Sequence, residues 1–335
     1  MDQRITEHAK ILVDYSCQIK KGDHVVVVVE DYGQELANEI VKEVAKRGGT
    51  TVVLQRSPET ERALLDAVPE EYVDNFPDHL FEMIKKTDVY IKIQSTANTR
   101  ALGNVSPEKF VRYQRMQKPL KQEILTKRWC GTATPTPALA QEAGMSLREY
   151  EDFVYNTIIR DWEKEAEIMY KVKEIIDKGR KVYIEGEDTE LTMSIDGRVA
   201  VASVGKHNMP SGEVFTAPVD DSTNGHIYFD IPLVYFGSLI EDVRLTFKNG
   251  VVVESSSSRN ENMLKKLIET DEGSNKLGEL GIGTNRGITT FTRYKACNGV
   301  NESAIHMDIV KTMKNGRLLV DGEVLQENGK WFWEL

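Results

Sequence analysis

The segment AIHMDIV, residues 304–310, carries an imidazole and a carboxylate two residues apart. Apolar residues alternate with His306 and Asp308, which predicts a β-strand with its apolar residues on one face and both polar residues on the other. An imidazole and a carboxylate on one rigid face suit a divalent ion such as Zn²⁺, Mn²⁺, Co²⁺ or Fe²⁺. A solvent-facing strand with ordinary polar residues has the same pattern, so this pair alone does not establish a metal site.

Two glutamates lie in segments rich in glycine and proline. Glu279 is part of GELGIGTN, and Glu213 is part of MPSGEVFTAPVDDSTNGHIYFD. Glycines permit unusual backbone angles and close approach to neighbours. Each glutamate alone is best interpreted as an exposed turn residue. Together with His306 and Asp308, the two glutamates form a carboxylate-rich set that predicts one or two bound metal ions.

Other polar residues are weaker candidates for the same site. His226, in NGHIYFD, is a candidate metal ligand or substrate-binding residue, and a structural role is equally consistent with its setting. Arg293 and Tyr294 are candidates for orienting substrate or stabilising an oxyanion, against a plainer interpretation as loop residues. Cys297 has no base beside it in the sequence and is interpreted as structural rather than as a nucleophile.

These candidates need two kinds of scaffold. The β-branched run from His24 to Glu30, the helical periodicity after it and the stop at Gly48-Gly49 predict a βαβ unit. The segment DVYIKIQS adds a further strand after a helix around LFEMIKK, so we expect a parallel-sheet α/β domain in the N-terminal part. Neither GxGxxG nor GxxxxGK[ST] follows the first strand, so a nucleotide is not implied.

The middle of the chain predicts one long helix. Ser146 and Glu149 form a capping-box pattern, and the helical pattern runs to Gly179. We expect this helix to connect an N-terminal domain, residues 1–180, to a C-terminal domain, residues 181–335. Short alternating segments follow, with a hairpin turn at Asn249-Gly250, which predict an α+β metal-binding domain rich in antiparallel strand.

Composition restricts the partners. The formal charge of −10, with no Lys/Arg block, argues against nucleic acid, and no stretch is apolar enough to span a membrane. The first residues, MDQRITEHAK, do not have the pattern of a secretory signal, and the three cysteines are scattered. We therefore expect a cytoplasmic protein in a reducing compartment.

Several of these segments together resemble the thermophilic metallo-aminopeptidases of the aminopeptidase T and aminopeptidase S type. The resemblance covers nearly the whole chain and includes KILVDYSCQIKKGDHVVVV, PTPALAQEAGMSLREYEDFVY, MPSGEVFTAPVDDSTNGHI, GELGIGTN and SAIHMDIV. It implies an N-terminal α/β domain, a C-terminal metal domain, a homodimer and removal of N-terminal residues from peptides. By the same resemblance, Glu213, Glu279, His306 and Asp308 match metal-site residues, with Glu213 as a second-ion ligand or general base.

The chain departs from that family between Gly283 and His306. The family has a longer stretch here with an acidic EDEK-like segment, a further histidine ligand and a tyrosine, whereas this chain has only NRGITTFTRYKACNGVNESAI, in which Tyr294 is the candidate substitute. A related plan, that of the iron-dependent dihydroxypyridine dioxygenase, uses two histidines and an aspartate, and Glu279 stands where its other histidine would be.

Three functions therefore stay open. The leading hypothesis is an aminopeptidase-like hydrolase with one or two Zn, Co, Mn or Fe ions per chain. The second is a mononuclear metal enzyme acting on a small aromatic or heterocyclic molecule. The third is a degenerate member that binds a peptide or partner without catalysis.

Overall fold

A computed structural model describes residues 2–235, 238–290, 304–306 and 309–334. The chain packs as two compact units, one of Met1–Ile159 with Gly205–Pro210 and one of Arg160–Val204 with Ser211–Leu335. The predicted division at residue 180 stays a prediction. By packing, the chain first passes from one unit to the other between Ile159 and Arg160.

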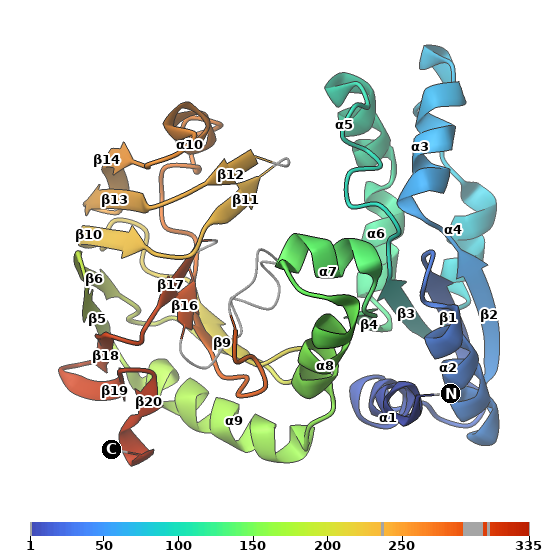
Figure 1. Cartoon of the computed structure of the whole chain (residues 1–335), viewed down its shortest axis with the longest axis horizontal. Helices are drawn as coiled ribbons and strands as arrows, with labels where there is room; N and C mark the ends of the chain where they lie inside the picture. The colour runs from blue at the N-terminus through green and yellow to red at the C-terminus, as the bar shows by residue number, and fades with distance from the viewer. Residues whose placement is uncertain (1, 236–237, 291–303, 307–308, 335) are drawn as a thin grey trace. The chain divides into compact units, whose positions relative to one another are not determined.

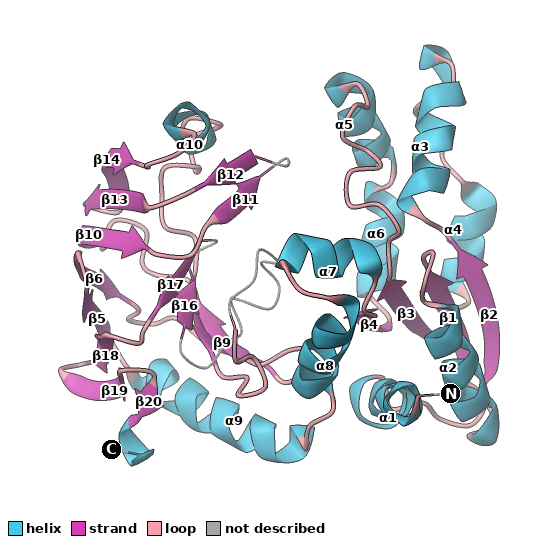
Figure 2. Cartoon of the chain, viewed as in Figure 1, coloured by secondary structure: helices cyan, strands magenta, loops and turns pink. Residues whose placement is uncertain are grey.

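The first unit is built on a five-stranded sheet with the order β2-β1-β3-β4-β8 (Figures 1 and 2). Its strands are β1 (His24–Val29), β2 (Thr50–Gln55), β3 (Val89–Gln94), β4 (Arg128–Ala133) and β8 (Asn208–Met209), and all their pairings are parallel. The expected βαβ unit and parallel sheet are confirmed. Helical segments of this unit are α1 (Gln3–Lys10), a π-helical turn (Ile11–Ser16), α2 (Gln34–Lys46), α3 (Pro58–Ala67), a 3₁₀ turn (Glu70–Tyr72), α4 (Asp78–Lys85), α5 (Pro107–Met116), α6 (Lys118–Leu125), α7 (Pro137–Ala143) and α8 (Leu147–Ile158).

The core of this unit lies on both faces of β1. Val26 and Val28 pack on one face with Ile84 of α4 and Leu120 of α6. Helix α2 packs against β1 and β2, and its buried residues include Leu36 and Ile40. A strand covered on both faces needs the continuous β-branched run that the sequence provides.

The single long helix expected from Ser146 to Gly179 is wrong. Its first part is α8, which begins with the expected capping box of Ser146 and Glu149. The helical hydrogen bonding then stops at Ile159, whose ψ is 81°, and Asp161 caps a new helix, α9 (Trp162–Lys178), by accepting from the N–H of Lys164. The local cap at Asp161 therefore outweighs the helical periodicity across the break.

The second unit contains an eight-stranded sheet with the order β14-β13-β10-β6-β5-β18-β19-β20 and a five-stranded sheet with the order β17-β16-β15-β9-β7. Their strands are β5 (Lys181–Gly186), β6 (Thr189–Ser194), β7 (Val201–Ser203), β9 (Glu213–Thr216), β10 (Asn224–Phe229), β13 (Val243–Lys248), β14 (Val251–Ser256), β15 (Leu280–Gly283), β16 (Ala304–His306), β17 (Val310–Thr312), β18 (Gly316–Val320), β19 (Glu323–Glu327) and β20 (Lys330–Trp331). The separate pair β11 (Leu233–Tyr235) and β12 (Ser238–Ile240), helix α10 (Glu261–Ile268) and a 3₁₀ turn (Phe332–Glu334) complete the unit.

The pairings between described strands in this unit are antiparallel, which confirms the expected strand-rich C-terminal fold. The predicted hairpin at Asn249-Gly250 is also confirmed, since both residues have positive φ, 49° and 79°, between the paired strands β13 and β14. None of the helices in the described ranges has the length and apolarity needed to cross a bilayer.

Candidate metal centre

The five-stranded sheet places two of the predicted ligand positions on the strands that flank β15 and a third directly before β15. Glu213 begins β9 and pairs with Gly283 of β15, while His306 of β16 pairs with Gly281 on the other side of β15. Glu279 directly precedes β15. Because alternate residues of a strand share a face, positions 281 and 283 and their partners His306 and Glu213 belong to one face of the sheet, and Glu279 lies two residues before Gly281.

The residues that alternate with this set are buried on the opposite face. Val214 of β9 and both Leu280 and Ile282 of β15 are almost completely buried. Helix α9 contacts β7 and β9, and its buried residues include Met169 and Val172. The apolar positions thus fix the register, since a shift of one residue would turn the glutamates toward the core.

Spacing along β15 separates the two carboxylates. Glu279 and Gly283, the partner of Glu213, are four residues apart, which is about 13 Å in an extended strand at ~3.3 Å per residue. The position of His306 falls midway, opposite Gly281. If both glutamates bind one ion, both side chains must extend toward that middle position. If two neighbouring ions bind, or one ion with a bound water, each glutamate side chain needs to extend a shorter distance.

A buried hydrogen-bond network holds the turn that precedes Glu213. The Oγ of Ser211 donates to the carbonyl of Ser203 at 2.7 Å and lies 2.9 Å from the Oγ of Ser203, which itself pairs with Glu213 across β7 and β9. The Nδ2 of Asn285 donates to the carbonyl of Ser211 at 2.8 Å, and its Oδ1 accepts from the N–H of Gly287. Sequence reasoning missed these positioning residues, although both lie in the segments that drew attention to the glutamates.

Gly212 provides the close approach in this turn. Its φ is 116°, and a Cβ added there would lie 2.8 Å from the Cβ of Asn285. Its N–H donates to Ser203 and its carbonyl accepts from the N–H of Thr284. A glycine is therefore required on steric grounds where β7, β9 and the end of β15 converge.

The strand beyond β16 is anchored by buried charge. Lys311 of β17, which pairs with Ile305, is almost fully buried, and its Nζ donates to the carbonyl of Tyr228 at 2.9 Å. Burial lowers the pKa of Lys311. Asp230 accepts from the backbone N–H of Thr312 at 2.7 Å and also from its hydroxyl. These contacts attach β17 to β10, and the only sequence signal for them is one lysine in an apolar strand.

The remaining predicted site residues are not brought to this face by the described structure. His226 is an exposed residue of β10, in the eight-stranded sheet, where it pairs with Glu190 and Thr246. Arg293, Tyr294, Cys297 and Asp308 lie outside the described residues, and His306 is described by its strand pairing. Their predicted roles stay predictions.

The donor types at the candidate centre suit a divalent metal. Glu213 and Glu279 are half-buried carboxylates, His306 is paired with Gly281 through its backbone, and neither Gly281 nor Gly283 has a side chain. Oxygen and imidazole donors suit Zn²⁺, Mn²⁺, Co²⁺ and Fe²⁺. Within the described ranges no group of three or more His, Cys, Asp or Glu side chains is assembled for a metal, and Asp308 is outside those ranges.

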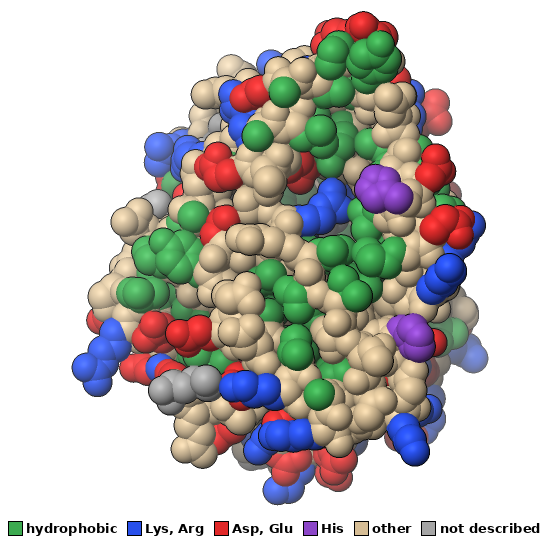
Figure 3. All heavy atoms as spheres, turned by 90° about the vertical axis from the view of Figure 1, so that its right-hand side faces the viewer, with side chains coloured by type: hydrophobic (Ala, Val, Ile, Leu, Met, Phe, Trp, Pro, Cys, Tyr) green, Lys and Arg blue, Asp and Glu red, His purple; other side chains and the backbone are tan. Residues whose placement is uncertain are grey.

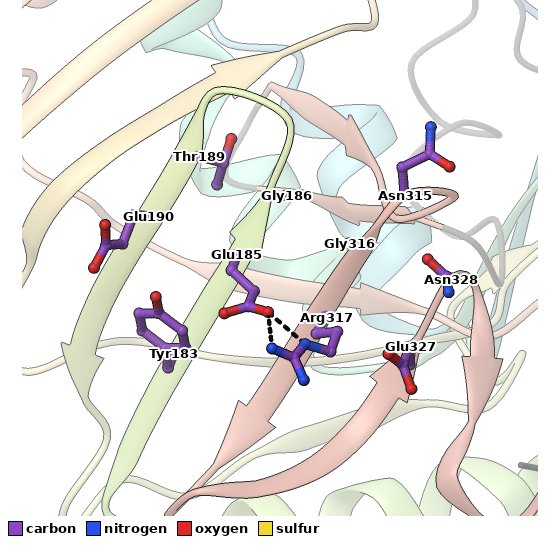
Figure 4. Close-up of a pocket in the computed structure, with 10 residues that line it drawn as sticks. All are labelled: Tyr183, Glu185, Gly186, Thr189, Glu190, Asn315, Gly316, Arg317, Glu327 and Asn328. Carbon is purple, nitrogen blue, oxygen red and sulfur yellow. Dashed lines mark hydrogen bonds and ion pairs between the residues drawn. The ribbon is translucent and has the colours of Figure 1, made fainter.

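The eight-stranded sheet has a surface hollow of about 440 Å³ that involves none of these residues (Figure 4). Its polar side chains include Glu185, Glu190 and Glu327, and Arg317 binds Glu185 through Nε and Nη2. A salt bridge within an open hollow leaves its charged groups hydrated. It therefore has the character of a polar surface rather than of a catalytic pocket.

The parallel sheet has a second place where a ligand would be expected. The order β2-β1-β3-β4 puts a topological switch between β1 and β3, where α/β proteins commonly bind ligands. Here the carboxylate of Glu30, whose pKa burial raises, accepts from the N–H of Ser95 at 2.9 Å, and the N–H of Tyr32 donates to the Ser95 carbonyl. The loops after the two strands are thus bonded to each other rather than open toward a nucleotide.

Comparisons with known proteins support the resemblance seen in the sequence. The family model described as thermophilic metalloprotease (M29) matches residues 1–297. Glu213 and Glu279 lie inside the matched range, and His306 and Asp308 lie beyond its end.

Two curated relatives have similar identities. Aminopeptidase AmpS of Bacillus subtilis is 24% identical over 315 residues, which cover 84% of this chain and 77% of the relative. Aminopeptidase 2 of Geobacillus stearothermophilus is 23% identical over 411 aligned residues, covering 100% of this chain and 99% of the relative. Since this chain has 335 residues, that relative contains segments with no counterpart here.

A solved structure, wild-type AmpT from Thermus thermophilus, has the same fold. The TM-score is 0.84 at 18% identity, with 98% of this chain and 99% of the other covered. The predicted fold class and family resemblance are confirmed, and the dioxygenase-like alternative is not favoured. The chain belongs to the thermophilic metalloprotease family M29 and is a metal-dependent hydrolase.

Proposed function

We propose that this chain is an aminopeptidase that releases N-terminal residues from peptides with the help of divalent metal bound on the five-stranded sheet. The observation that supports this most is the pairing of β15 with both neighbours, which sets Glu213 opposite Gly283 and His306 opposite Gly281, with Glu279 directly before the strand. Relatives named aminopeptidase cover most of this chain. The proposal therefore has two supports, the carboxylates positioned around β15 and the similarity to relatives named aminopeptidase.

Glu279, His306 and Asp308 are the proposed ligands of the metal, which is Zn, Co, Mn or Fe. Glu213 holds a second ion or, if one ion binds, accepts a proton from the attacking water. A bound ion of this kind lowers the pKa of its water toward neutrality and polarises a carbonyl oxygen. The approximately 13 Å offset between Glu213 and Glu279 along the ladder is easier to reconcile with the second-ion or base role than with both glutamates on one ion.

Further roles belong to the same proposal. Tyr294 stabilises the developing oxyanion, and Arg293 and His226 contact substrate. The protein acts in the cytoplasm as a homodimer, and its catalytic domain comprises residues 181–335. These assignments extend the family membership, which is established without them.

Leu-, Arg- and Ala-p-nitroanilide, each supplied with Zn²⁺, Mn²⁺ or Co²⁺, test the activity. N-acetylated forms of the same substrates are the matched control, because an aminopeptidase needs a free α-amino group. We expect release of p-nitroaniline from at least one free substrate and none from its acetylated form. If every free substrate stays intact, or if both forms are cleaved alike, the proposal is wrong.

Metal stoichiometry tests the ligand assignment. We expect Glu279→Gln to reduce bound metal, whereas Glu254→Gln, a change at an exposed glutamate of β14, leaves it unaltered. Glu213→Gln separates its two roles. Loss of one metal equivalent identifies a second-ion ligand, and loss of activity with full metal content identifies a base. Unchanged metal and activity in Glu213→Gln would exclude both roles.

A further inference from the structure

Phe215 lies within β9 on the same face of the five-stranded sheet as Glu213. Residues of a strand alternate between its faces, so these two positions share a face and are about 7 Å apart along the strand. Phe215 pairs with Gly281 of β15, and Gly281 pairs with His306 on its other side. The position of Phe215 is therefore two strand spacings, about 10 Å, from that of His306.

The hydrophobic core of this unit does not account for Phe215. Val214, the residue between Glu213 and Phe215, is completely buried on the opposite face, and helix α9 contacts β9. Burial alternates along the strand, since Val214 and Thr216 are buried while Glu213 and Phe215 are half-buried. A half-buried phenylalanine retains apolar surface that a bound ligand can cover.

Strand β7 extends this apolar surface. Val201 pairs with Phe215 and is 50% exposed, and Val199, two residues earlier, is 73% exposed. Directly opposed residues of an antiparallel pair have Cβ atoms about 4.5–5.5 Å apart, so Val201 and Phe215 form an apolar pair. The next pair on the same face is Ser203 with Glu213. The apolar pair is therefore the immediate neighbour of a proposed metal-site carboxylate.

The charges of these two strands favour an apolar ligand group over an acidic one. Strand β7 consists of Val-Ala-Ser and β9 of Glu-Val-Phe-Thr, so Glu213 is the one charged residue that the two strands contain. An acidic side chain placed here would be repelled by that carboxylate and would gain no basic partner from either strand. An apolar side chain would instead contact Phe215 and Val201.

Exposed apolar side chains are not special to β7, so exposure alone does not identify a subsite. Val52 and Val53 of β2 are 47% and 38% exposed, and Figure 3 shows hydrophobic side chains gathered on the side of the molecule to which β2 belongs. Strand β2 belongs to the parallel sheet and contains none of the proposed metal ligands. Phe215 and Val201 differ because their register places them beside Glu213.

In an aminopeptidase, the side chain of the released residue lies close to the reacting centre. The carbonyl carbon that water attacks is bonded to the Cα of that residue, so the side chain begins two bonds from the attacked carbon. Binding sites for small groups commonly combine an apolar lining with a few placed polar groups. The apolar pair beside Glu213 provides such a lining at the required place.

We propose that Phe215 and Val201 form the subsite for the side chain of the released residue, and that this subsite selects large apolar side chains such as those of Leu and Met. The inference rests on the proposed aminopeptidase function and adds the class of N-terminal residue that is removed. A Leu side chain covers more of the apolar surface than an Ala side chain does, so more of that surface leaves water.

The ratio of kcat/KM for Leu-p-nitroanilide to kcat/KM for Ala-p-nitroanilide measures this selection. We expect a ratio of about 10 to 100 in the unmodified protein, because three further carbon atoms enter the subsite. Phe215→Ala should lower the ratio by about 10-fold. Phe332→Ala is the matched control and should keep the ratio, since Phe332 is a 48% exposed phenylalanine of the turn after β20. Circular dichroism checks that both variants stay folded.

Val201→Glu tests the same subsite through charge. Val201 is exposed enough to accept a carboxylate without disturbing the core. We expect the ratio of kcat/KM for Arg-p-nitroanilide to that for Leu-p-nitroanilide to rise by about 10-fold, because the new carboxylate pairs with the substrate guanidinium. Val253→Glu is the matched control and should keep the ratio, since Val253 is a 53% exposed valine of β14 in the eight-stranded sheet.

Binding of L-leucinol and L-alaninol separates failure of the subsite from failure of the peptidase proposal. Both amino alcohols have a free amine and a side chain but no bond to cleave. In calorimetry we expect L-leucinol to bind about 10-fold more tightly than L-alaninol, and Phe215→Ala to lose this preference. A protein that cleaves no aminoacyl p-nitroanilide would refute the peptidase proposal, and the amino alcohols would still decide whether the subsite exists.

Four results would each overturn the subsite. They are a Leu to Ala ratio near one in an active unmodified protein, a ratio that Phe215→Ala does not change, equal effects of Val201→Glu and Val253→Glu, and no preference for L-leucinol over L-alaninol.

Discussion

Gly212→Ala tests whether the turn before Glu213 positions the metal site. The added Cβ would lie 2.8 Å from the Cβ of Asn285 and 3.1 Å from its backbone nitrogen, in a residue with φ of 116°. The backbone strain costs about 1–3 kcal/mol, and the overlap costs about as much again. Since Asn285 donates to the Ser211 carbonyl, relief of the overlap must displace the turn that carries Glu213.

Gly197→Ala is the matched control. Gly197 also has positive φ, 73°, but a Cβ there would meet nothing within 4 Å. We expect only the backbone term, about 1–2 kcal/mol, with metal content and activity unchanged. Gly212→Ala should lower stability by roughly 2–6 kcal/mol and also lose metal or activity.

Urea unfolding, metal analysis and hydrolysis of an aminoacyl p-nitroanilide measure the three quantities on both variants. If Gly212→Ala lost no more stability than Gly197→Ala and kept full metal and activity, the contact with Asn285 would not position Glu213.

Three further predictions concern separate parts of the chain. His306→Ala should lower the bound metal content and reduce activity by more than the roughly 10- to 100-fold that is typical when a residue hydrogen-bonded to a metal ligand is lost. The control His207→Ala removes an exposed ring stacked on Trp129 and should leave the metal content unchanged. Equal metal content in both variants would exclude His306 as a ligand. Ser146→Ala should cost about 1 kcal/mol in urea unfolding through loss of the α8 cap, with unaltered metal content, and an unchanged midpoint would contradict this. Burial lowers the pKa of His8 from 6.5 to about 3. Below pH 6.5 the unfolded chain therefore binds a proton that the folded chain does not. The free energy of unfolding should decrease as the pH is lowered below 6.5, by up to ~1.4 kcal/mol per pH unit. His8→Gln retains a donor for Thr132 and should show a shallower fall between pH 6.5 and 5; identical pH profiles would refute this origin.

The first sheet could be predicted because its signals are local. The apolar run after His24 is long enough for a strand buried on both faces, and Gly48, with φ of 77°, ends the helix between the two strands. The turn at Asn249-Gly250 and the box at Ser146 are similarly local, since each depends on residues within a few positions. At these positions the tertiary packing favours the same conformation as the local sequence, so the local prediction holds in the folded chain.

The break at Ile159 could not be predicted from periodicity. Apolar residues continue at helical spacing on both sides, and Asp161 is compatible with either a helix interior or a cap. Its selection as a cap coincides with the passage from one compact unit to the other, which is a property of the packed chain. The local pattern therefore predicted that this region is helical but not that it consists of two helices, α8 and α9.

The candidate site was predicted in part. The alternation around His306 predicts one strand over residues 304–310, and this is wrong, because β16 ends at His306 and pairs antiparallel with β17, which begins at Val310. The glycines around Glu279 predicted a turn-rich segment, and the pairing of β9 with β15 joins residues far apart in sequence. The support of Ser211 by Asn285, and of β17 by Lys311, depends on that long-range pairing. No local pattern carries information of this kind.

Residues 205–210 have a consequence for synthesis of the chain. Strand β8 pairs with β4, and the Thr132 hydroxyl donates to the carbonyl of Met209 at 2.8 Å, yet α9, β5, β6 and β7 come between them in the sequence. During synthesis on the ribosome, the edge of β4 that pairs with β8 stays unpaired until α9, β5, β6 and β7 have been synthesised. A fragment that ends at residue 159 would keep that edge open permanently, so we expect it to aggregate even though it contains every other strand of its sheet.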